Sequence, residues 1–102
     1  MRLTNEQIDY LRVLGSDLRP AVDIGAGGLT RFVLKQIDQA LSNEELVKVR
    51  VPFGDREKRN AVLDQLAPET DAQVIQRANN VAVLYRPAEQ PVIDLPAPPR
   101  AV

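Results

Sequence analysis

The chain has 102 residues, with 13 Lys and Arg against 14 Asp and Glu, and 44% of its residues are hydrophobic. Such a length and composition are typical of one globular domain, and no apolar run approaches the ~20 residues of a membrane span. The absence of His and Cys removes the usual general base, the thiol nucleophile and most transition-metal ligands. We therefore expect a single cytoplasmic domain that is not an enzyme and needs no cofactor or metal.

The first predicted helix follows Thr4 and ends between Gly15 and Pro20. Thr4 and Gln7 have the spacing of a capping box, in which each residue bonds the backbone N–H of the other. One face of this helix is apolar, with residues at near-helical spacing: Ile8, Leu11, Leu14 and Leu18. Residues 20–24 then indicate a short strand that proline can enter at its first position.

A glycine-rich stretch joins this strand to the second predicted helix: Ile24-Gly25-Ala26-Gly27-Gly28-Leu29-Thr30. Glycine allows a close approach of backbone to ligand, and the helix that follows presents unpaired N–H groups and a positive dipole end. Such a joint can accept a charged ligand such as phosphate.

Two well-known phosphate motifs do not match this loop. A dinucleotide fingerprint would need glycine at Thr30, and a P-loop would need Gly-Lys followed by Ser or Thr. The remaining pattern is G-x-x-G, from Gly25 to Gly28, which is the spacing that KH modules use to clamp a nucleic-acid backbone. The alternative is a tight turn that binds no ligand.

Thr30 is the predicted N-cap of the second helix. Its buried stripe is expected to contain Leu29, Val33, Ile37, Ala40 and Leu41. Arg31 and Lys35 lie in and next to the first turn, where they could pair with phosphate. Phe32 lies at one edge of the stripe, and because aromatic residues at helical spacing are usually core, we expect it to pack inward rather than to stack on RNA.

Residues 46–53 form the clearest strand pattern, with Lys48 and Arg50 on the face opposite to the valines. Before it, Glu44 and Glu45 are interpreted as solvated surface acids. A third helix is expected from its N-cap at Asp55 to Pro68. Two further strands, residues 72–77 and 81–86, flank a turn at positions 79 and 80, where Asn tolerates positive φ.

The predicted order is α-β-α-β-α-β-β, in a single α/β domain with a four-stranded mixed sheet. We place the domain at residues 1–87. Five of the eight prolines, at positions 87, 91, 96, 98 and 99, follow or end it. Residues 88–102 are therefore expected to be an extended or disordered tail.

The chain resembles the CRM domain family, in particular the small YhbY-like bacterial proteins, over residues 3 to about 87. The residues that carry the resemblance include Leu3-Thr4, Leu18-Arg19-Pro20, Ile24-Gly25, Gly28-Leu29-Thr30, Glu45-Leu46 and Leu84-Tyr85-Arg86-Pro87. The resemblance implies a fold similar to the C-terminal domain of translation initiation factor three. It also implies RNA binding, with the precursor of large-subunit rRNA as the partner, and a role in ribosome assembly.

The expected RNA site comprises the loop, the start of the second helix and two strand residues: Gly25, Ala26, Gly27, Gly28, Thr30, Arg31, Lys35, Lys48 and Arg50. Family members typically carry Lys where this chain has Ala26. The net charge of −1 is also low for an RNA-binding domain. The alternative function is a protein-interaction adaptor with weak RNA binding, and ribosomal or assembly proteins are further candidate partners.

Overall fold

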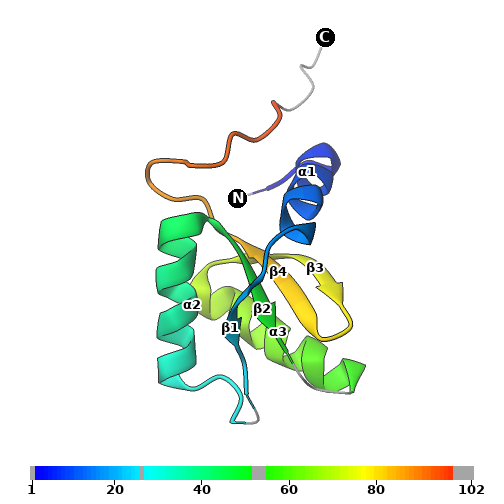
Figure 1. The fold of residues 1–102 in the computed structure, drawn as a ribbon, viewed down its shortest axis with the longest axis vertical. Coiled ribbons are helices and arrows are strands. Elements are labelled where there is room, and N and C mark those ends of the chain that lie inside the picture. Colours follow the sequence, from blue (N-terminus) through cyan, green and yellow to red (C-terminus); the bar gives the residue numbers. More distant parts are fainter. Residues whose placement is uncertain (1, 26, 52–54, 98–102) are drawn as a thin grey trace.

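The computed structural model describes residues 2–25, 27–51 and 55–97. The elements are α1 (Asn5–Ser16), β1 (Pro20–Asp23), α2 (Arg31–Glu44), β2 (Leu46–Arg50), α3 (Arg56–Thr70), β3 (Gln73–Ala78) and β4 (Val81–Tyr85). This is the predicted element order (Figure 1). Within these ranges, no helix is long and apolar enough to cross a membrane.

The four strands form one mixed sheet in the order β1-β2-β4-β3. β1 and β2 are parallel, because the chain returns through α2, whereas β4 is antiparallel to both of its neighbours. β3 and β4 form the predicted hairpin, with Asn79 at a φ of 47° in its turn. The prediction of a single α/β domain with a four-stranded mixed sheet is confirmed.

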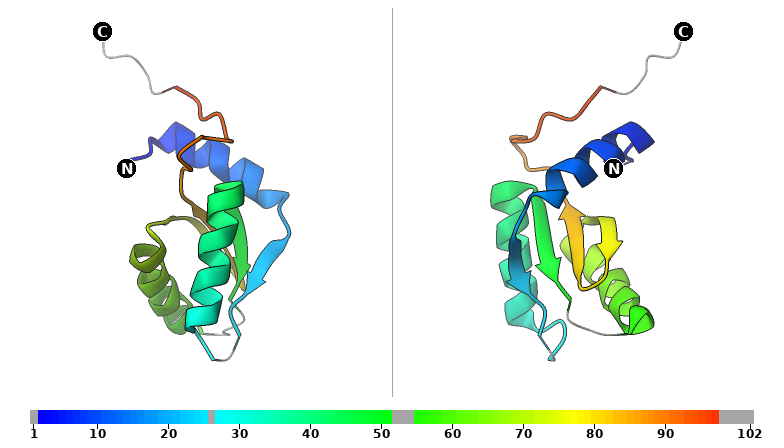
Figure 2. Two further views of the ribbon diagram at one scale, coloured as in Figure 1. Left: turned by 90° about the vertical axis from the view of Figure 1, so that its left-hand side faces the viewer. Right: turned by 45° about the vertical axis from the view of Figure 1, so that its right-hand side comes forward.

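Helices lie on both faces of the sheet (Figure 2). Alternate residues of β2 and β4 point to opposite sides. On one side, Val47, Val49 and Leu84 join the main core under α2 and α3. On the other side, Leu46 and Val83 join a second, smaller cluster with Leu11 of α1. The sequence did not predict this division.

The helix starts form as the local sequence predicts. The Thr4 side chain accepts a hydrogen bond from the Gln7 N–H at 3.1 Å, and the Gln7 side chain accepts one from the Thr4 N–H at 3.0 Å. Thr30 caps α2, and Asp55 caps α3 by accepting a bond from the Glu57 N–H. Because each cap uses partners two or three residues apart, the sequence is sufficient to predict them.

Two predicted boundaries were wrong. α3 continues through Pro68 to Thr70, since a proline so close to the end interferes with only one carbonyl of the preceding turn, and Asp71 at a φ of 54° ends the helix instead. β2 ends at Arg50, so Val51 lies beyond the strand that was predicted to include it, and positions 52 and 53 lie outside the described residues.

The sequence interpretation of Glu45 as a solvated surface acid was wrong, because this side chain is fully buried. It follows α2 with a φ of 65°, and its carboxylate accepts hydrogen bonds from the backbone N–H groups of Ala88, Val92 and Ile93 at 2.6 to 2.7 Å. Residues 88–97 form no helix or strand, yet Ile93 and Leu95 pack on the second cluster. The first part of the predicted tail is therefore fastened to the domain.

The Glu45 contacts predict that stability falls in acid. Burial raises the pKa of the Glu45 carboxyl, but the N–H donors of Ala88, Ile93 and Val92 outweigh burial, and the pKa lies below the ordinary 4.5. A carboxyl with a lowered pKa in the folded state contributes stability above its unfolded pKa, and this contribution is lost as pH falls through the folded pKa. Urea unfolding of the parent and Glu45→Gln between pH 7 and pH 3 measures it. The difference between the two proteins should shrink toward pH 3, and a constant difference would contradict this assignment.

Candidate functional site

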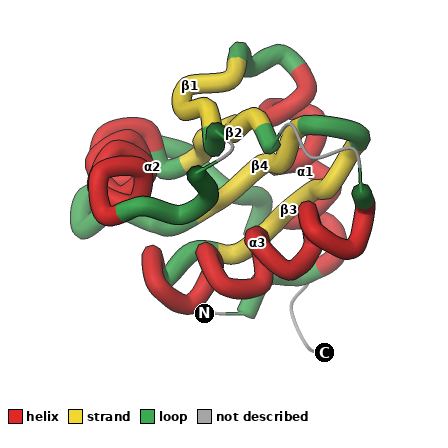
Figure 3. Tube along the Cα trace, turned by 90° about the horizontal axis from the view of Figure 1, so that it is seen from below, coloured by secondary structure: helices red, strands yellow, loops and turns green. Residues whose placement is uncertain are grey.

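The glycine-rich loop lies at one end of the long axis of the molecule. β1 and β2 run in the same direction, so the loop after β1 and the connection after β2 leave the sheet at the same end (Figure 3). The backbone N–H of Ile24 donates to the Arg50 carbonyl at 2.8 Å, which ties the two strand ends together. We call this the loop end: residues 24, 25 and 27–31, Lys35, Arg50 and the first turn of α3. In open α/β sheets, ligands bind beyond the carboxyl ends of parallel strands.

The loop is a hydrogen-bonded turn with an open surface. The Gly28 N–H donates to the Gly25 carbonyl at 3.0 Å, and the Thr30 N–H donates to the Gly28 carbonyl at 3.1 Å. Only Gly28 among the described glycines has a positive φ, of 73°. Gly25 and Gly27 are exposed, and a Cβ built on Gly25 would meet nothing within 4 Å. A ligand can therefore approach the loop backbone without meeting a side chain at either position.

The N-terminus of α2 carries no compensating acid. Thr30 Oγ1 accepts a hydrogen bond from the Val33 N–H at 3.1 Å, but the first turn contains no Asp or Glu. The first turns of the other two helices each contain one, Glu6 in α1 and Glu57 in α3. Among the three helix N-termini, the positive dipole end of α2 is thus the least neutralised by acids, and it directly follows the glycine loop.

Three basic side chains of α2 and β2 at the loop end have no partner among the described residues. Arg31, Lys35 and Arg50 are exposed and form no hydrogen bond or ion pair with another described side chain. Asp23 is the neighbour of Arg50 in the strand register, yet no ion pair joins these two described side chains. Their charges therefore remain available to an anion.

The basic residues elsewhere in the described chain are more often engaged: Arg12, Lys48, Arg59, Arg77 and Arg86 each donate to a carbonyl or a polar side chain. Arg86 is the clearest case, because its guanidinium donates to the Asp38 carboxylate at 2.6 Å and to the Thr70 carbonyl at 2.9 Å. It thereby links α2 to the end of α3, so we assign it to the fold rather than to a binding site.

The structure brings most of the predicted RNA site together at the loop end: Gly25, Gly27, Gly28, Thr30, Arg31, Lys35 and Arg50. Ala26 lies outside the described residues. Lys48 is separate, because its side chain is on the α1 side of the sheet and its Nζ donates to the Ser16 carbonyl at 3.5 Å. The sequence placed Lys48 and Arg50 on one strand face, but it could not show that α1 lies over part of that face.

The expectation for Phe32 was wrong, because 70% of its surface is exposed. The inward stripe of α2 is instead made by the other predicted residues, among them Val33 and Ile37. A further basic residue that the sequence interpretation missed is Arg56, which is exposed and begins α3 at the loop end. The only signal for Arg56 was a mixed charge run, which is typical of any solvated helix face.

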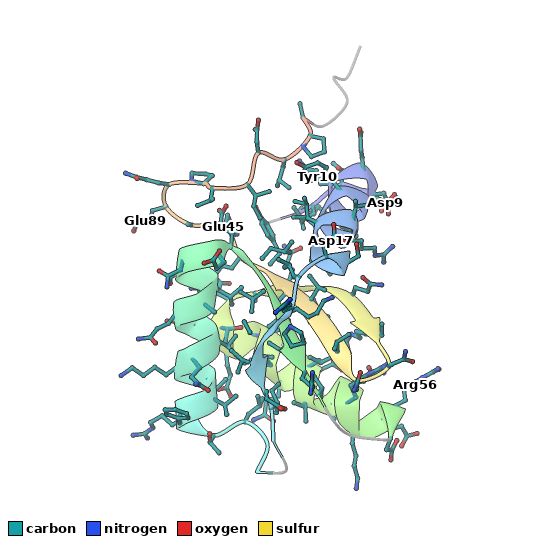
Figure 4. The ribbon with its side chains drawn as sticks, in the orientation of Figure 1. Asp9, Tyr10, Asp17, Glu45, Arg56 and Glu89 are labelled. Carbon is teal, nitrogen blue, oxygen red and sulfur yellow. The ribbon has the colours of Figure 1, made fainter. Side chains whose placement is uncertain are left out.

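Charge differs between the two ends of the molecule. Figure 4 places Asp9, Asp17 and Glu89 at the end formed by α1 and the tail, and Arg56 toward the opposite end. This separation explains how a net charge of −1 is compatible with a locally basic surface. An anion would be attracted to the loop end and repelled by the α1 end.

The comparisons with known proteins agree with this fold. A family model described as the CRS1/YhbY (CRM) domain matches residues 3–86. A Haemophilus influenzae protein named "RNA-binding protein" is 39% identical over 94 residues, which cover 92% of this chain and 95% of that protein. "Probable RNA-binding protein YqeI" of Bacillus subtilis is 36% identical and is covered over 99% of its length, against 92% of this chain.

A solved structure gives the same result in three dimensions. The solution structure of the Staphylococcus aureus protein SAV1595 superposes with a TM-score of 0.81 at 33% identity, over 93% of this chain and 100% of that one. The family match and both relatives extend over nearly all of the described elements, the glycine-rich loop included. The chain therefore belongs to the CRS1/YhbY (CRM) domain family.

Proposed function

We propose that this protein binds RNA at the loop end. The observation that carries the proposal is the open glycine loop before an α2 N-terminus without acids, next to the unpaired cations Arg31, Lys35 and Arg50. Backbone N–H groups and helix N-termini are common phosphate ligands, and Arg and Lys add charge. Two relatives are named as an RNA-binding and a probable RNA-binding protein, which supports the same ligand.

The mechanism is recognition of the RNA backbone rather than catalysis. Because Gly25 and Gly27 lack side chains, a phosphate can approach the turn closely, while Arg31 and Arg50 supply positive charge to neutralise it. Such contacts position the RNA but read little sequence. A GxxG loop used in this way corresponds to the backbone clamp of KH modules.

We further propose that the RNA is the precursor of large-subunit rRNA and that the protein acts in ribosome assembly. The identity of the RNA and the role in ribosome assembly are proposed from the family resemblance and not from the geometry of the site. Crosslinking in cells followed by sequencing of the attached RNA tests it. Enrichment of large-subunit rRNA over small-subunit rRNA and messenger RNA is expected, and an even distribution among the three would contradict it.

The proposed phosphate contacts predict a moderate salt dependence. If Arg31, Lys35 and Arg50 each neutralise one phosphate of unpaired RNA, the plot of log affinity against log salt has a slope of about −2. Raising salt from ~50 to ~200 mM should then weaken binding about twentyfold. Titration of a labelled oligoribonucleotide by fluorescence polarisation gives the slope. The double variant Arg31→Gln, Lys35→Gln should bring it toward about −1, and a slope near zero for the parent would exclude phosphate contacts.

A second candidate function, a protein adaptor, is favoured by one surface at the opposite end. α1 and the tail enclose a shallow groove of about 530 Å³ lined by Glu6, Asp9, Tyr10, Val13, Asp94, Leu95 and Pro96. The groove has an apolar floor and three carboxylates but no basic side chain. These features suit a cationic protein segment that carries an apolar anchor residue.

A photo-crosslinking amino acid at Val13, which is 68% exposed, tests the adaptor in cells. The expected result is a crosslinked peptide rich in Lys and Arg, identified by mass spectrometry, and its loss in an Asp9→Lys, Asp94→Lys background. The same amino acid at Gln65, exposed on α3, is the control. The adaptor function would be excluded if both positions gave identical peptides, or if the crosslink at Val13 persisted in the Asp9→Lys, Asp94→Lys background.

A further inference from the structure

Packing within the fold does not explain why Phe32 is exposed. It is the second residue of α2, and 70% of its surface faces solvent. The other exposed residues of the same face are polar: Lys35, Gln36 and Gln39, at spacings of three, four and seven. The apolar stripe that anchors α2 runs along the other side, through Val33 and Ile37. The fold would therefore lose little if a polar residue stood at position 32.

The position of Phe32 places its ring beside the proposed phosphate site. Helical side chains lean toward the N-terminus, so the residue at position 32 covers the turn before it, at the end of the glycine loop. Arg31 precedes it, and Lys35 lies one turn further on the same side. Gly27 and Gly28 present no side chain that could cover the ring, and no ring contact joins Phe32 to another described residue. The ring is thus an unoccupied apolar surface between cations.

An aromatic ring next to a phosphate clamp fits one part of RNA, the base. In a duplex, the bases are paired and stacked on each other, so their faces are not available. Unpaired bases expose both faces and stack on aromatic side chains in a largely sequence-independent way. We propose that Phe32 stacks on an unpaired base whose backbone lies in the glycine loop, and that the loop end consequently selects single-stranded RNA over duplex RNA. The inference rests on the proposed RNA binding at the loop end and specifies its substrate.

Fluorescence polarisation with two labelled probes tests the inference. One probe is a ten-nucleotide single strand of mixed sequence. The other is a hairpin in which the same ten nucleotides pair fully with their complement, and its short tetraloop is crosslinked so that no base is free. Phe32→Ala should weaken binding of the single strand about five- to hundredfold, the range of one aromatic stack. Phe32→Tyr should keep binding within about threefold, because the stacking face remains.

The salt slope separates stacking from charge. Phe32→Ala removes no charge, so its affinity should drop at every salt concentration while the slope stays that of the parent. Val92→Ala is the matched control, since Val92 is similarly exposed at 69% but lies in the tail, and it should leave RNA binding unchanged. Thermal unfolding should show Phe32→Ala as stable as the parent, because little of the ring is buried.

The possible results separate base stacking by Phe32 from RNA binding at the loop end in general. The inference is supported if Phe32→Ala binds the single strand more weakly than the parent, Phe32→Tyr keeps the affinity of the parent, and the parent binds the hairpin weakly. If Phe32→Ala binds the single strand as the parent does while Arg31→Gln, Lys35→Gln binds weakly, the inference fails and RNA binding at the loop end stands. If the parent binds both probes equally, the proposed selectivity is wrong. If it binds neither, the proposed function and the inference fall together.

Discussion

Replacing Gly27 with aspartate should remove at least nine-tenths of the affinity for single-stranded RNA and leave the domain folded. A Cβ at position 27 would meet only Thr30 Cγ2 at 3.8 Å, an ordinary contact, and Gly27 is not among the residues of positive φ. The added carboxylate would stand where a phosphate is proposed to lie. A tenfold loss corresponds to about 1.4 kcal/mol, which is modest for two like charges at close range.

Gly27→Asn is the matched control, because it adds a side chain of the same shape without charge. The effect of charge is the difference in dissociation constant between the two variants, measured by polarisation at low salt. Gly28→Ala provides the backbone control, since its φ of 73° makes any side chain cost about 1–2 kcal/mol of stability. Equal RNA affinity for Gly27→Asp and Gly27→Asn would show that no phosphate lies near the loop.

Glu45→Ala should destabilise the domain by about 3 kcal/mol, a large share of the ~5–15 kcal/mol of a typical domain. The variant removes an ionised acceptor that holds the N–H groups of Ala88, Val92 and Ile93. Each such hydrogen bond to a charged group contributes about 1.5–3 kcal/mol, and the sum is reduced because the released segment can bond water. Loss of the tail also exposes the apolar surface under Ile93.

Urea unfolding measures the loss, and hydrogen exchange at residues 88, 92 and 93 reports whether the tail is released. Glu44→Ala is the control, since Glu44 is adjacent and has the same charge but is exposed, and surface substitutions usually change stability by less than about 0.5 kcal/mol. Protection of these amides in Glu45→Ala, at the level of the parent, would show that the carboxylate does not hold the tail.

The features that the sequence predicted correctly depend on neighbours a few residues apart. The caps at Thr4 and Thr30 are local, and the alternation of Val47 with Lys48 defines a strand with two different faces. The proposed site depends on the same kind of local signal, because the loop glycines and Arg31 are consecutive or nearly so, and it stays a prediction. Arg50 was chosen only because it shares a strand face with Lys48, whereas the parallel register of β1 and β2 is what brings the end of β2 to the loop end.

The features that the sequence missed depend on distant contacts. Glu45 has partners 43 to 48 residues away, and these are backbone groups that carry no sequence signature. Phe32 was assigned to the core on the usual behaviour of aromatic residues, whereas the direction of the α2 stripe decides its exposure. The strand order and the position of α1 over the second face were also not predictable, because several topologies satisfy the same alternation.

The way Glu45 holds the tail limits where proline can stand. The carboxylate binds main-chain N–H groups, and proline is the one residue that has none. Prolines occur at positions 87, 91 and 96 but not at 88, 92 or 93. The carboxylate does not constrain the side chains at those three positions, and the constraint on Ile93 comes instead from its packing on the second cluster. The prolines beside them also restrict the unfolded chain, which lowers the conformational entropy lost when the tail docks.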